Sequence, residues 1–84
     1  MEANELRRAL AVVARILEAG EHTHKQGASN HWLSLSPREH VRRAMIHAEK
    51  FILGILVDSD EDELAHAAVR LLLALERRER ERTT

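Results

Sequence analysis

The chain has 84 residues, enough for one domain, and it contains no cysteine. The missing cysteine excludes a disulfide framework, a thiolate nucleophile and a zinc–thiolate site. The 13 basic and 14 acidic side chains give a net charge of −1, which argues against the strongly basic face that nucleic acids require. No apolar run approaches the roughly 20 residues of a membrane span, and the acidic N-terminus has no secretory signal pattern. We therefore expect a soluble, cytoplasmic domain.

The first predicted element is a helix over residues 5–19. Asn4 is its expected N-cap, and Gly20 stands where a helix commonly stops. Its apolar positions recur at steps of three and four, which is the helical period; they are Leu6, Leu10, Val13 and Leu17.

Residues 20–35 are predicted as a loop with room for one short helical turn. The segment is rich in glycine, serine and asparagine, and it holds His22, His24 and His31 beside Trp32. Loops of this length in compact domains are often functional.

A second helix is predicted over residues 37–57, and its start carries the clearest local signal in the chain. Ser36 can cap the amide of Glu39, and Pro37 occupies the first helical position, where its missing N–H costs nothing. The main apolar face of this helix comprises Val41, Ala44, Met45, Ala48, Ile52, Ile55 and Leu56.

A third helix is predicted over residues 61–80, after a tight turn at residues 58–60. Ser59 or Asp60 is its expected cap. One apolar stripe comprises Leu64, Ala68, Leu71, Leu72 and Leu75, and a second comprises Ala65, Val69 and Leu73. From Glu76 to Arg82 acids and bases alternate, which predicts a solvated, fraying end.

These elements define an all-α, three-helix unit in which the second and third helices form a long antiparallel hairpin. Both hairpin helices carry apolar residues around more than half of their circumference, so each must be covered on two sides. The first helix can cover one side. A second copy of the chain is the simplest cover for the other, which predicts a helical-bundle homodimer or a higher oligomer.

His47 and His66 are candidate acid–base groups because each lies inside a helix beside an apolar face. In the expected hairpin, His66 lies level with Phe51 and His47 level with Arg70, which would form a polar cleft between the helices. The alternative is a pair of half-buried histidines that are hydrogen-bonded for structural reasons.

Carboxylates supply a second candidate site, for Mg²⁺ or Mn²⁺, because hard cations take several oxygen ligands. Glu18 lies on the first predicted helix, Glu21 follows Gly20 in the predicted loop, and Glu49 lies on the second helix, while acidic residues crowd the start of the third. Helix capping and solubility explain the same residues without a metal.

Trp32, Asn30 and Lys25 form a third candidate, a loop that could stack on a base and contact phosphate. The alternative is that Trp32 pins the loop to the core through its large apolar ring.

Several spaced motifs together resemble the N-terminal domain of the dATP/dGTP diphosphohydrolases, a family common in phages and similar to MazG-like all-α pyrophosphohydrolases. The matching stretches span residues 9–76: Lys25-Gln26-Gly27 with Asn30 and Trp32, Ala44-Met45-Ile46-His47, Gly54, Asp58, and Glu63-Leu64-Ala65-His66-Ala67-Ala68. The resemblance implies a dimeric helical domain that hydrolyses a deoxynucleoside triphosphate to monophosphate and pyrophosphate with Mg²⁺ or Mn²⁺. It makes His47, His66 and Glu49 the candidate catalytic residues. The candidate nucleotide contacts are Lys25, Asn30, Trp32 and Arg70, and the candidate metal ligands are Glu18, Glu21, Glu49, Asp62 and Glu63.

The chain departs from that family at several positions. Gln26 replaces the expected tyrosine, Arg70 replaces an expected amide, and the paired Glu-x-x-Glu and Glu-x-x-Asp motifs are not cleanly present. The alternative hypothesis is a non-catalytic helical module that dimerises or binds another protein. DNA binding through Arg38, Arg42 and Arg43 is not expected, because Glu39 and Glu49 interrupt this charge.

Overall fold

The computed structural model describes residues 1–23, 28–54 and 62–83, with side chains except those of residues 20–23 and 28–30. Three α-helices are present, as predicted: α1 (Arg7–Thr23), α2 (Pro37–Leu53) and α3 (Glu63–Thr83). Two 3-10 helices accompany them, η1 (Ala3–Leu6) and η2 (Ala28–Ser34). The described parts of the chain contain no strand, so the all-α prediction is confirmed.

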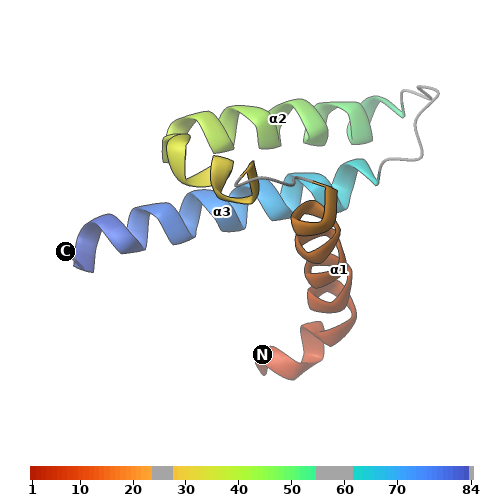
Figure 1. Ribbon diagram of the computed structural model, residues 1–84. Helices are drawn as coiled ribbons and strands as arrows, with labels where there is room; N and C mark the ends of the chain where they lie inside the picture. The colour runs from red at the N-terminus through yellow and green to blue at the C-terminus, as the bar shows by residue number, and fades with distance from the viewer. Residues whose placement is uncertain (24–27, 55–61, 84) are drawn as a thin grey trace.

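The hairpin of α2 and α3 forms the body of the molecule (Figure 1). The two helices run side by side in opposite directions, and η2 lies at the start of α2 against the C-terminal half of α3. In contrast, α1 crosses the hairpin at a steep angle and projects away from it.

The N-terminal half differs from the prediction in two ways. The first helix continues to Thr23 instead of stopping before Gly20, and residues 28–34 form η2 where a loop was expected. Asn4 lies inside η1, and its carbonyl accepts the backbone N–H of Arg7. Gly20 did not stop the helix because a glycine costs only about 1 kcal/mol inside one.

The start of α2 is the one that the sequence predicted. Ser36 has an extended backbone, and its hydroxyl accepts the amide N–H of Glu39 at 3.1 Å. Pro37 is the first helical residue. The Glu39 carboxylate pairs with Arg42 and Arg43, each at 3.3 Å.

The end of α2 and the start of α3 both fall at other residues than predicted. The second helix ends at Leu53, not Val57, because Gly54 adopts a left-handed conformation with φ 61° and its N–H bonds to Lys50 and Phe51 carbonyls. Residues 55–57 and the predicted turn at 58–60 lie outside the described residues. Asp62, rather than Ser59 or Asp60, caps α3, since its carboxylate accepts the amide N–H of Ala65 at 3.0 Å.

The described core is built from small side chains. Its buried apolar residues are Val13, Ala44, Ala65, Ala67, Val69 and Ala74, whereas most leucines and isoleucines are exposed. The radius of gyration is 13.7 Å, against about 12 Å for a compact chain of this length. Alanine contacts thus let the helices approach closely, while the larger apolar groups stay outside.

Among the described residues, no helix combines the length and the apolar character needed to cross a membrane.

Candidate functional site

The two predicted catalytic histidines lie together on one flank of the hairpin. The His47 ring of α2 stacks on the His66 ring of α3 with centroids 5.4 Å apart. The Nδ1 atom of His47 lies 2.6 Å from a carboxylate oxygen of Glu63, and both side chains are largely buried. A carboxylate accepts here, so Nδ1–H of His47 donates, and in the neutral form of the ring Nε2 carries a lone pair.

The register of the hairpin differs from the prediction by one to two helical turns. His47 lies level with Glu63 and His66 instead of Arg70, and Arg70 lies level with His40. The second helix ends at Leu53, four residues earlier than predicted. Apolar periodicity alone could not reveal this earlier end or the register that goes with it.

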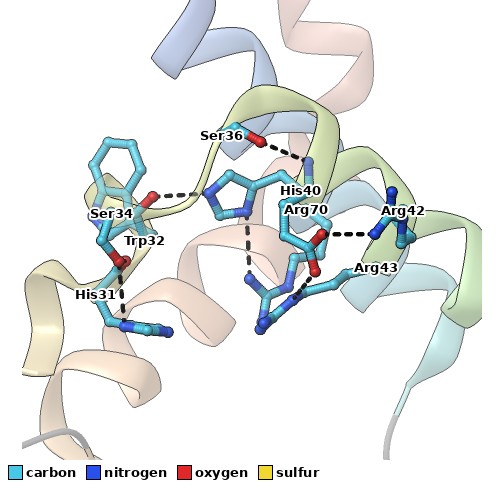
Figure 2. Close-up of polar contacts among 9 residues, drawn as sticks. His31, Trp32, Ser34, Ser36, His40, Arg42, Arg43 and Arg70 are labelled. Atoms are coloured by element: carbon cyan, nitrogen blue, oxygen red, sulfur yellow. Dashed lines mark hydrogen bonds and ion pairs between the residues drawn. The ribbon is translucent and has the colours of Figure 1, made fainter.

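A fully buried histidine organises the other end of the same flank. His40 has no exposed surface. Its Nε2–H donates to the Trp32 carbonyl at 2.9 Å, and its Nδ1 accepts from Arg70 at 3.4 Å (Figure 2). The carbonyl can only accept and the guanidinium can only donate, so these partners select the neutral Nε2–H tautomer. His40 thereby joins η2, α2 and α3.

Positive charge gathers beside this histidine. Burial, and then the nearby charge of Arg43, lowers the pKa of Arg70 from its ordinary value, while Glu39 opposes the shift. Figure 2 shows the Arg43 and Arg70 side chains extending toward the same region, and the Arg43 guanidinium pairs with the Glu39 carboxylate at 3.3 Å. Since arginine stays protonated in proteins, two guanidinium groups face one small region between α2 and α3.

The candidate metal ligands do not converge within one chain. Glu18 is exposed on α1 and Glu49 is exposed on α2, while the Glu21 side chain lies outside the described residues. Asp62 caps α3, and Glu63 is bonded to His47. Within the described residues there is no group of three or more His, Asp or Glu that could hold a metal ion.

Of the four candidate nucleotide contacts, the structure describes the side chains of Trp32 and Arg70. Lys25 and the side chain of Asn30 lie outside the described residues, as do the side chains of His22 and His24. Trp32 is half-buried, and the guanidinium carbon of Arg80 stands 5.0 Å from its ring centroid. This cation–π contact occupies the ring, and it supports the interpretation that Trp32 pins its segment to the hairpin.

The sequence predicts His40 on the same flank of the second helix as His47, because it lies seven residues earlier, but His40 was not among the candidate site residues. Glu39 and Arg43 were not identified as members of this polar flank, because nothing in the pattern tied Arg43 to Arg70.

Comparisons with known protein families, with curated proteins and with solved structures found no match to this chain.

Proposed function

We propose that this protein binds a deoxynucleoside triphosphate on the polar flank of the α2–α3 hairpin, as a relative of the dATP/dGTP diphosphohydrolases. One observation carries the proposal. The two stretches on which that resemblance most depends, one ending in His47 and one spanning Glu63 to His66, lie against each other as a hydrogen-bonded and stacked cluster.

The chemistry of the flank suits an anionic ligand. Arg43 and Arg70 present two guanidinium groups, which bind phosphate oxygens in a bidentate geometry, and their mutual repulsion is relieved by an anion between them. The Nε2 atom of His47, in a ring oriented by Glu63, can accept a hydrogen bond or a proton from a bound group.

Hydrolysis of the bound nucleotide is the second part of this proposal. Among the described residues of one chain, no group of three or more His, Asp or Glu could hold a metal ion for this reaction. The direct assay is pyrophosphate release from dATP and dGTP, with Mg²⁺, with Mn²⁺ and without added metal. Binding is measured separately, as the shift in melting temperature on adding each nucleotide.

Two variants make these assays specific. Arg70→Gln removes a guanidinium from the flank and should abolish the nucleotide-induced shift, and His47→Gln should weaken it. Arg38→Gln is the matched control, because Arg38 is exposed at the start of α2, and its shift should equal that of the unmodified chain. No shift and no pyrophosphate release with either nucleotide would sink the proposal.

A second candidate function rests on a different observation. Fourteen large hydrophobic residues of the described chain are exposed, and eleven of them are leucine, isoleucine or phenylalanine.

This exposed apolar surface favours a non-catalytic helical module whose function is to associate with a second copy of itself. The chain exposes 6881 Å², whereas a compact monomer of 9.6 kDa exposes about 5,100 Å². The difference exceeds the surface of about 800 Å² that each partner contributes to a standard interface. The test is the mass in solution by analytical ultracentrifugation, where a monomer at all concentrations would contradict self-association.

A further inference from the structure

A continuous exposed apolar stripe lies on α3. We call it the leucine face, and it comprises Leu64, Ala68, Leu71, Leu72 and Leu75. These residues recur at helical spacing along one side of α3. All four leucines are more than two-fifths exposed, at 54%, 51%, 42% and 46% in chain order. The primary apolar stripe of this helix is therefore the one that the chain does not cover.

The leucine face continues onto α2 through a groove. Val41 and Pro37 of α2 line it together with Leu71, Ala74, Leu75 and Arg78 of α3. Met45 and Ile52, at four and eleven residues after Val41, extend the apolar surface along α2, and they are 66% and 80% exposed. The hairpin thus presents one apolar side, with a charged arginine at one end of the groove.

We infer that the leucine face binds the leucine face of a second copy, with the two α3 helices antiparallel. The inference rests on the self-association proposed above, and it adds the surface and the direction of packing. The occupant is a second copy because the surplus surface of the chain exceeds what each partner contributes to a standard interface, and because a face on a two-fold axis must be complementary to itself.

Side-chain size favours the antiparallel direction. When the stripe is reversed on itself about its midpoint, Leu64 meets Leu75 of the second copy and Ala68 meets Leu71. A large residue then packs against a small one at the centre, as close packing requires. Parallel packing instead places Leu71 against its own counterpart.

Charge favours the same direction. Parallel packing would bring the Arg78 side chains of the two copies together at the end of the face, and Arg78 is 56% exposed and lines the groove. Antiparallel packing places each Arg78 near the acidic start of the other α3, where Asp62 and Glu63 lie. It also sets the two helix dipoles in the favourable orientation.

The absence of cysteine from the chain allows a direct test by cross-linking. Leu64→Cys and Leu75→Cys are made as separate single variants, mixed, refolded together and oxidised under mild conditions. We expect the disulfide between the two different variants to dominate. Disulfide formation within the Leu64→Cys variant alone, at the level of the mixture, would mean parallel packing and would overturn the inference.

A substitution tests whether the leucine face is the surface through which the chain self-associates. Leu71→Glu should convert the dimer to a monomer, as measured by sedimentation, with helix content followed by circular dichroism to show that the chain still folds. Leu10→Glu is the matched control, since Leu10 is 49% exposed on α1, and it should stay dimeric. A Leu71→Glu dimer would sink this inference but leave self-association standing, whereas a monomeric unmodified chain would contradict both.

Discussion

His40 connects three elements through a single imidazole, because each ring nitrogen has a partner on a different segment. The Trp32 carbonyl and the Arg70 guanidinium are those partners, and the ring itself is completely buried. Polar side chains that are buried in this way hold their neighbours in fixed positions, since every alternative leaves a donor or an acceptor without a partner.

Replacing this ring should therefore destabilise the fold. His40→Leu removes a hydrogen bond from the buried side of both partners, although the Trp32 carbonyl keeps the backbone N–H of Leu35 at 3.4 Å. We expect it to lower the free energy of unfolding by about 2–3 kcal/mol. The measurement is urea denaturation followed by circular dichroism at one fixed protein concentration. His31→Leu is the control, because His31 is exposed, and it should change stability by no more than about 0.5 kcal/mol. Equal effects from the two substitutions would contradict the role assigned to His40.

The sequence allowed this site to be predicted only in part. His47 and His66 could be identified because each interrupts an apolar face at helical spacing. The roles of Arg70 and Glu63 could not, because they depend on the hairpin register, and a shift of one turn changes every pair across it. Glu63 was a candidate metal ligand, and its hydrogen bond from His47 could not be predicted from the sequence.

At the scale of elements, the local signals located the start of α2 but not its end. Ser36 and Pro37 fixed the start of α2, because a cap and a preset φ act within four residues. Ile55, Leu56 and Val57 continue the apolar period past Gly54, and the pattern therefore hid the left-handed glycine that ends α2. The C-terminal end of α3 was also not solvated throughout, since Arg77 donates to the Leu35 carbonyl at 3.1 Å.

The cap of α2 leads to a first prediction at this scale. Ser36→Ala removes the acceptor for the Glu39 amide and should cost about 1 kcal/mol of stability in urea denaturation. Ser36→Asp retains an acceptor and should recover most of the loss. If the aspartate variant is as unstable as the alanine variant, the hydroxyl does not act as a cap.

The end of α2 leads to a second prediction at the scale of elements. Gly54 has a positive φ, and a Cβ added there would meet no atom within 4 Å, so any cost of substitution comes from the backbone conformation alone. We expect Gly54→Ala to cost about 1 kcal/mol and Gly54→Asn less, because asparagine tolerates the left-handed region. Thermal unfolding of the three chains should give the order glycine, asparagine, alanine, and an alanine variant as stable as the parent would contradict it.

At the scale of the whole molecule, the buried and exposed residues are distributed in an unusual way. Alanines fill the described core while leucines lie outside, which is the reverse of what a stable monomer requires. If the chain self-associates as proposed, burying these leucines between two copies would add to its stability, because it removes them from water.

This distribution predicts that stability depends on protein concentration. If folding and dimerisation are coupled, the midpoint of thermal unfolding should rise by about 4 °C for each tenfold increase in concentration. The Leu71→Glu variant should show no such dependence. A midpoint that is constant over a hundredfold range in the unmodified chain would show that folding does not need a partner.

The contact of Arg80 with Trp32 has one practical consequence. Trp32 is the only tryptophan, and the chain has no tyrosine, so all of its intrinsic fluorescence comes from a single indole stacked under a guanidinium group. That emission reports whether η2 is seated on the C-terminal half of α3, without any label. The wavelength and intensity of the Trp32 emission can therefore follow the docking of η2 on α3, whose contacting residues are nearly fifty positions apart in the chain.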